Sequence, residues 1–137
     1  MDSKQYLKQA YRLDELIRFN QKELDELHDL STTLSATDYS KDKVQTSLPG
    51  DASYTNIIAK IDELERVIKE DIERLLSLKI EIRDVISSVQ NNDERLLLNL
   101  RYLHFSTWEE ICFEMSVSMR TAHRIHAMAL RSVKIPE

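Results

Sequence analysis

The stretch YTNIIAKIDELERVIKEDIERLLSLKIEIRDVISSVQ, residues 54–90, carries apolar side chains at steps of three, four or seven. The positions that follow these steps are Ile57, Ile61, Leu64, Ile68, Leu75, Leu78, Ile82, Val85 and Val89. This spacing places them on one side of a helix and is close to the heptad pattern of a coiled coil. Asp71 is the one exception, and we expect Ile72 beside it to supply the apolar contact. The stretch therefore predicts one long helix.

Residues 3–30 have the same kind of pattern, with Ala10, Leu13, Ile17, Leu24 and Leu27 on one face. Two long helices in succession predict an antiparallel, coiled-coil-like helical hairpin over residues 1–90. This region is expected to serve oligomerisation or partner binding, and a homodimer through the hairpin is one possibility.

Residues 31–53, between these two stretches, predict a long flexible loop. They are rich in serine, threonine and aspartate, which favour local bonds from side chain to backbone over helix. Pro49-Gly50-Asp51 is the strongest turn signal in the chain.

Composition excludes several classes of protein. The 137 residues include one glycine and two prolines, too few for the tight turns of β-rich, Rossmann or P-loop folds. No apolar run approaches the length of a membrane span, and no membrane partner is expected. The single cysteine, Cys112, predicts a reducing compartment, the cytoplasm. What remains is an all-α fold.

Residues 91–137 are predicted to be a separate domain of three short helices. The first helix, residues 93–103, has Asn92 as its N-cap, with inward-facing residues Leu96, Leu97, Leu100 and Leu103. Thr107 is expected to cap the second helix, in a capping box with Glu110. Its inner face is Ile111, Cys112 and Met115. Ser118 is expected to cap the third helix, which buries Ala122, Ile125 and Ala129. Two short helices joined by a tight turn are typical of a helix-turn-helix.

Two motifs in this third of the chain resemble region 4 of sigma factors. Leu100-Arg101-Tyr102 is followed by Ser106-Thr107-Trp108-Glu109-Glu110-Ile111, and residues 118–126, SMRTAHRIH, are similar to that fold's recognition helix. The chain departs from the pattern at Cys112, where alanine is usual, and at Ser116, often glycine. The nearest resemblance is to the ArpU/RinA-like transcriptional regulators of phages and prophages. It implies a DNA-binding helix-turn-helix, RNA polymerase as a possible partner and activation of late genes.

The candidate residues for contact with double-stranded DNA gather in and before the third short helix. They are Thr107, Ser118, Met119, Arg120, Thr121, His123, Arg124 and Arg131. Arg120, His123 and Arg124 face outward if Ala122 and Ile125 face inward, and arginine can bond guanine bidentately. All of the net charge of −5 arises in residues 1–92, whereas residues 118–136 contain no acid. Only this local stripe should attract DNA.

Other chemistries are not expected. His104, Cys112, His123 and His126 lack the spacing of zinc ligands, so neither a metal nor another cofactor is predicted. No pairing of a nucleophile with a base indicates an enzyme. Trp108 is expected to pack beneath the third helix. Two alternatives to the regulator stay open: a DNA-packaging component of the small-terminase kind, and a coiled-coil interaction protein that does not bind DNA.

Overall fold

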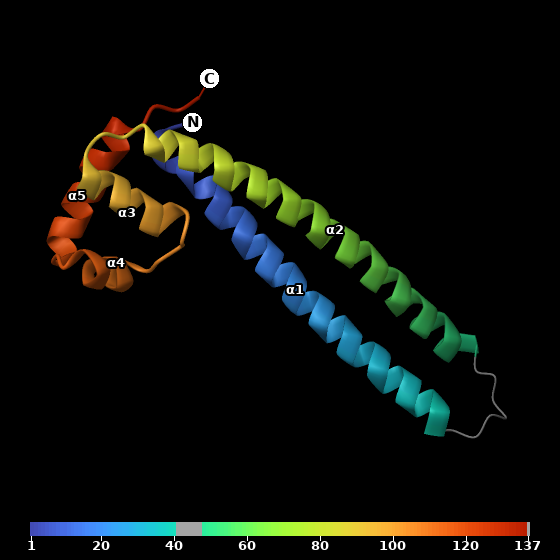
Figure 1. The fold of residues 1–137 in the computed structure, drawn as a ribbon. Coiled ribbons are helices and arrows are strands. Elements are labelled where there is room, and N and C mark those ends of the chain that lie inside the picture. The colour runs from blue at the N-terminus through green and yellow to red at the C-terminus, as the bar shows by residue number, and fades with distance from the viewer. Residues whose placement is uncertain (41–47, 137) are drawn as a thin grey trace. The chain divides into compact units, whose positions relative to one another are not determined.

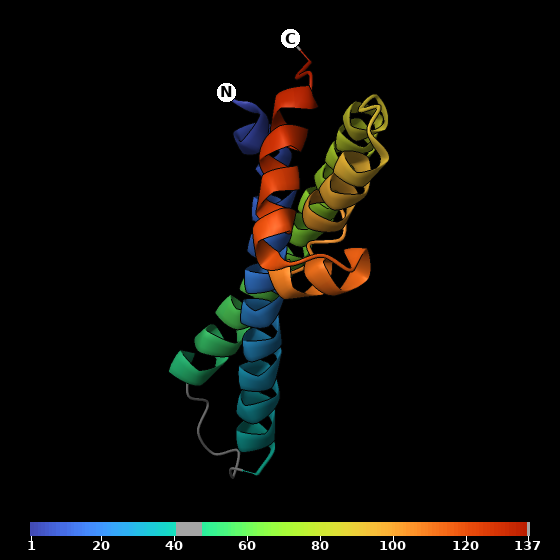
Figure 2. The ribbon, with the colours of Figure 1, turned by 90° about the vertical axis from the view of Figure 1, so that its left-hand side faces the viewer.

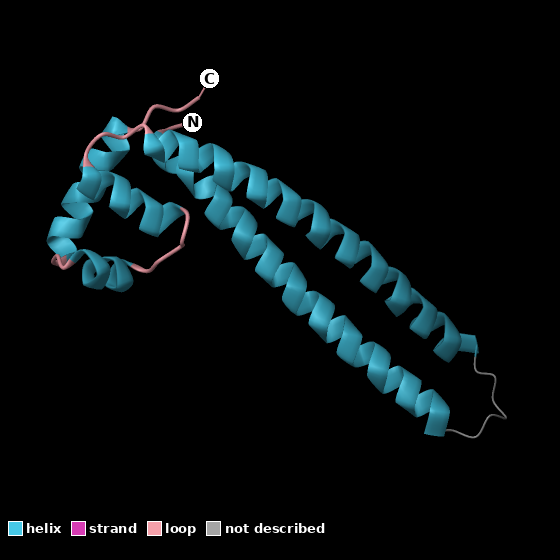
Figure 3. Cartoon of the chain, in the orientation of Figure 1, coloured by secondary structure: helices cyan, strands magenta, loops and turns pink. Residues whose placement is uncertain are grey.

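The computed structural model describes the backbone of residues 1–40 and 48–136 and the side chains of residues 1–34 and 53–136. Within these residues it contains five helices and no strand (Figure 3). They are α1 (Ser3–Ser40), α2 (Leu48–Ser87), α3 (Asn92–Tyr102), α4 (Trp108–Met115) and α5 (Met119–Ser132) (Figure 1). The predicted all-α fold is confirmed. No helix in the described ranges is both long enough and apolar enough to span a membrane.

Helix α1 begins in a reciprocal capping box. The Asp2 carboxylate accepts a hydrogen bond from the Gln5 amide at 2.8 Å, and the Gln5 side chain accepts one from the Asp2 amide at 3.0 Å. Both bonds satisfy backbone donors that the first turn of a helix leaves without intrahelical partners.

The loop predicted for residues 31–53 is too long, because residues 31–40 and 48–53 are helical. Thr32 and Thr33 donate their hydroxyls to the carbonyls of His28 and Asp29, both at 3.0 Å. A threonine that bonds its own helix in this way does not break it. Pro49 lies in the first turn of α2, where its missing amide hydrogen is not needed. The flexibility predicted for residues 41–47 lies outside the described residues.

Contacts among the described residues divide the chain into two compact units, at points other than the predicted boundary between residues 90 and 91. Unit 1 comprises Met1–Asp14 and Arg74–Glu137, and unit 2 comprises Glu15–Glu73. Helices α1 and α2 contribute to both units and pack antiparallel within each.

The core of unit 1 joins both ends of the chain. Tyr6, Leu7 and Ala10 of α1 pack with residues of α2, α3 and α5. The buried members from these helices and their flanks are Ile82, Val85, Ile86, Val89, Leu98, Tyr102, Leu103, Ala129 and Val133. Figure 2 shows α5 beside the first turns of α1. A second cluster, centred on Leu97, Ile111 and Ala122, holds α3, α4 and α5 together.

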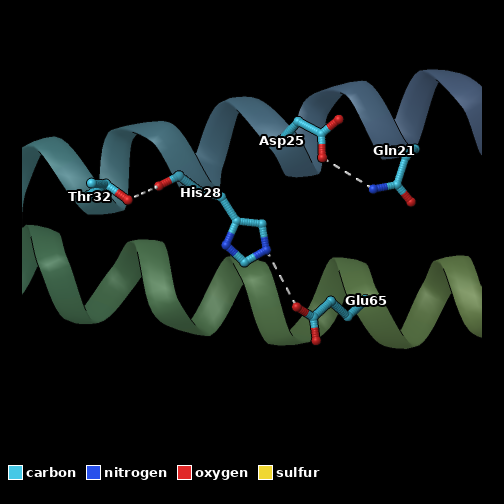
Figure 4. Close-up of polar contacts among 5 residues, drawn as sticks. All are labelled: Gln21, Asp25, His28, Thr32 and Glu65. Carbon is cyan, nitrogen blue, oxygen red and sulfur yellow. Dashed lines mark hydrogen bonds and ion pairs between the residues drawn. The ribbon is translucent and has the colours of Figure 1, made fainter.

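The core of unit 2 is a seam between α1 and α2, built on Leu24, Ile61 and Ile68. Figure 4 shows polar contacts beside this seam. Gln21 donates to Asp25 at 3.2 Å within α1, and His28 Nε2 lies 3.6 Å from Glu65 Oε1 of α2. The His28 and Glu65 side chains are about half exposed, so their contact adds little stability beyond the apolar seam.

Two sequence predictions about inward positions, those for Ile72 and Leu96, are wrong. Asp71 is buried, whereas Ile72 is 50% exposed, because the helix keeps position 71 in line with Ile68 and Leu75. Leu96 is 45% exposed and Leu98 is fully buried in its place.

Asn91, not Asn92, caps α3. Its side chain accepts a hydrogen bond from the Glu94 amide at 3.0 Å. Helix α2 ends at Ser87, before the predicted end at residue 90.

Candidate nucleic-acid interface

The turn between α4 and α5 is formed by residues 116–118. Ser116 has φ 56° and ψ 45°, in the left-handed region that glycine adopts most readily. The Thr107 hydroxyl oxygen accepts a hydrogen bond from the Glu110 amide, and that of Ser118 accepts one from the Thr121 amide, both at 3.2 Å. Both caps are where the sequence predicted them. They fix where each helix begins.

Helix α5 has one buried and one exposed face. The side chains of Ala122, His126 and Ala129 are buried, and Ile125 is half-buried. Arg120, Arg124 and Arg131 are exposed and follow one another at steps of four and seven, which places them on one side of the helix. We call these three residues the arginine stripe. At 1.5 Å per residue, Arg131 lies about 16 Å along the axis from Arg120.

The remaining candidate residues surround the start of α5 in different ways. His123 is exposed, and Met119 is 41% exposed with its sulfur 4.0 Å from Cys112 Sγ. Ser118 donates its hydroxyl to Thr121 Oγ1 at 3.0 Å, so both side chains are engaged in the cap. Thr107 is exposed but belongs to the start of α4. The structure therefore gathers Arg120, His123 and Arg124 on the first turns of α5, and sets Thr107 apart on another helix.

An aromatic cluster underlies α5. The Trp108 ring lies 4.2 Å from the ring of His123 and 5.0 Å from that of His126, between centroids. Arg101 covers the same indole, with its guanidinium carbon 4.8 Å from the ring centroid. It also donates to the Ser106 carbonyl at 3.0 Å. Trp108 thus packs beneath the third short helix, as predicted, and it ties α4 to α5.

Two polar links join α3 to α5. The Tyr102 hydroxyl and His126 Nε2 are hydrogen bonded at 2.6 Å, and Ser132 donates to Glu94 at 2.7 Å. All but Ser132 of these four residues are buried. Because a buried polar group is costly without a partner, these links favour one orientation of α5 over others. No local pattern in the sequence indicates this structural role of His126.

Burial and, as smaller contributions, the nearby positive charges of Lys4, Arg101, His123 and Lys8 lower the pKa of His126 to about 4. Burial also raises the pKa of Tyr102 to about 12. His126 is therefore neutral at pH 7. The same interactions bring Lys4 and Lys8 of α1 into the electrostatic surroundings of α5. No local sequence signal could identify these two lysines, since they stand at the opposite end of the chain.

Among the described residues, no three histidine, cysteine, aspartate or glutamate side chains are grouped as the ligands of a metal ion would be. Cys112 is partly buried beside Met119.

Comparison with known proteins identifies a family. The model of the family described as "protein of unknown function (DUF1492)" matches residues 33–134, and the chain belongs to that family. The match covers α2 to α5 and therefore includes the arginine stripe and the aromatic cluster. No curated protein and no solved structure matches the chain.

Proposed function

Starting from membership of this family, whose description assigns no activity, we propose that the protein is a sequence-specific DNA-binding regulator of transcription. The proposal takes α4 and α5 as a helix-turn-helix and α5 as the helix that enters the major groove. The single observation that carries it is the arginine stripe, exposed on α5 opposite the face that packs on α3. The sigma region 4 resemblance supports the same assignment and favours a regulator of the ArpU/RinA-like phage kind.

The geometry of the stripe is suited to reading DNA. The major groove admits one α-helix, and arginines on its first turns can reach base edges. Each bidentate bond from arginine to guanine gives roughly 1–3 kcal/mol of discrimination against other bases. Arg120 and Arg124 are assigned to base edges and Arg131 to a phosphate further along the helix. Lys4 and Lys8 add positive charge near α5 and should strengthen attraction to the DNA backbone.

The same proposal includes where the protein acts and which partners it binds. The protein acts in the cytoplasm of a bacterial host and carries out no enzymatic reaction. RNA polymerase is its proposed second partner, and two copies pair through the α1–α2 hairpin.

The test is a selection of DNA from a random library with the purified chain, at two salt concentrations. We expect a recurring motif whose enrichment falls as salt rises. Arg120→Ala/Arg124→Ala should lose the motif while retaining the helical content of the original protein. The matched control, Arg12→Ala/Arg83→Ala, removes the same charge from exposed positions on α1 and α2 and should retain it.

The proposal fails if no motif is recovered at either salt concentration. It also fails if the two double variants lose binding equally, because net charge alone would then account for the affinity.

A further inference from the structure

A groove lies between α3 and α4, within unit 1. Its volume is about 530 Å³. It is lined by Leu100, His104, Ser106, Glu109, Glu110, Phe113 and Glu114. We call it the α3–α4 groove. None of its residues belongs to the arginine stripe or to the other proposed DNA contacts.

Phe113 gives this groove an apolar wall. Its side chain is 84% exposed, more than any other large apolar side chain in the described part of the chain. Phe113 is not needed to pack α4. The opposite side of this helix joins the core through Trp108, Ile111, Cys112 and Met115. Leu100, half-buried, supplies a second apolar contact inside the groove. An exposed phenylalanine beside a concave surface is typical of a protein-binding site.

The charge of the groove is negative. Glu109, Glu110 and Glu114 are all exposed and lie along the same short helix, and no lysine or arginine lines the groove. These carboxylates repel nucleic-acid phosphates and attract cationic side chains. The groove and the arginine stripe therefore select occupants of opposite charge.

We propose that the α3–α4 groove binds a segment of a partner protein that is rich in lysine or arginine and carries a bulky apolar side chain. The apolar side chain packs against Phe113 and Leu100, and its cationic neighbours pair with the three glutamates. Charge complementarity excludes DNA from this surface. Because the groove is separate from the exposed face of α5, the proposal does not depend on DNA binding.

The test uses three fluorescent synthetic peptides and the full-length protein. The first peptide contains lysine and leucine at helical amphipathic spacing. The second has glutamate in place of lysine, and the third has serine in place of leucine. We expect the first peptide alone to bind with a measurable Kd in fluorescence anisotropy, and more weakly as salt rises. In amide NMR spectra the shifted resonances should belong to residues 100–114.

Two variants locate the binding. Glu109→Gln/Glu110→Gln/Glu114→Gln should weaken binding of the lysine and leucine peptide about tenfold, since exposed ion pairs contribute modestly and additively. Phe113→Ser should weaken it by a similar factor of about ten, through lost apolar contact. Both substitutions change exposed side chains and should leave the melting temperature nearly unchanged.

Matched controls distinguish binding in the groove from non-specific effects of net charge and of exposed apolar surface. Glu15→Gln/Glu26→Gln/Glu73→Gln removes the same charge from exposed positions in unit 2, and Leu76→Ala removes an exposed apolar side chain of α2. Both controls should bind the peptide as the original protein does. Arg120→Ala/Arg124→Ala should also keep peptide binding, whether or not the chain binds DNA.

Several outcomes would overturn the proposal. Equal binding of all three peptides, or equal weakening by groove and control variants, would show a non-specific interaction. Resonance shifts confined to other surfaces would place the peptide elsewhere. A second copy of the chain is the competing occupant: oligomers that dissociate only in Phe113→Ser, with no peptide binding in the monomer, would assign the groove to self-association.

Discussion

Acidification should destabilise unit 1 through His126. The side chain is 8% exposed, and its hydrogen bond to Tyr102 and its contact with Trp108 hold it between α3, α4 and α5. The folded protein holds the pKa of His126 at about 4, against 6.5 for an ordinary histidine. As the pH falls below 6.5, the unfolded chain therefore binds a proton that the folded chain resists. Stability from this group is present above pH 6.5 and is lost as the pH falls towards 4.

The size of the effect follows from the pKa difference. One pKa unit corresponds to about 1.4 kcal/mol, so the full interval from 6.5 to 4 is worth roughly 3 kcal/mol. Between pH 7 and pH 5 the free energy of unfolding should fall by about 2 kcal/mol because of His126. Carboxylates contribute their own pH dependence, and a variant is needed to isolate the histidine.

His126→Gln provides that variant, because an amide can bond Tyr102 but does not titrate. Urea unfolding followed by fluorescence reports on unit 1, since Trp108 is the sole tryptophan of the chain. We expect the drop in unfolding free energy between pH 7 and pH 5 to be about 2 kcal/mol smaller in His126→Gln than in the original protein. His104→Gln is the matched control, because it replaces an exposed histidine of unit 1 that is not among the charged groups acting on His126, and it should keep the full drop.

The reasoning would be refuted by a His126→Gln curve parallel to that of the original protein. It would be equally refuted if His104→Gln flattened the curve as much as His126→Gln, because the effect would then not depend on the buried histidine.

Two further predictions concern local packing and backbone geometry. Leu97→Ala should cost about 2–5 kcal/mol of unfolding free energy, because Leu97 is fully buried between α3, α4 and α5. Leu96→Ala, one residue away and 45% exposed, should cost under about 1 kcal/mol in the same urea titration, and similar losses would contradict the burial pattern of α3. Ser116→Gly should raise stability by about 1 kcal/mol, because glycine adopts the left-handed conformation of Ser116 without a steric penalty. Ser116→Ala retains the Cβ atom and should bring no gain, so equal melting temperatures for the two variants would contradict the strain at this turn.

Several features could be predicted from the sequence because they depend on neighbouring residues. Thr107 and Ser118 cap their helices as expected, since an N-cap needs only a hydroxyl and an amide three positions later. The exposed side of α5 also follows from spacing alone, with Arg120 and Arg124 one turn apart and Ala122 and Ala129 opposite.

The sequence predictions are wrong where two local signals compete or where tertiary packing decides which of two adjacent residues is buried. Residues 31–40 contain loop-forming side chains, yet hydroxyls such as that of Thr32 are satisfied inside the helix. The choice between Leu96 and Leu98 depends on the rotation of α3 against α5. Periodicity cannot decide this rotation when Leu96, Leu97 and Leu98 are consecutive.

The sequence by itself determined that the chain is all-α, where α4 and α5 are capped and which side of α5 bears arginine. Helical period and capping are short-range properties, so residues within a few positions of one another specify them. Only the tertiary structure decided that His126 bonds Tyr102, that Lys4 and Lys8 lie near α5, and that Leu100 of α3 and Phe113 of α4 border one groove. These features join residues from different helices. Side-chain packing over the whole of unit 1 sets how those helices meet.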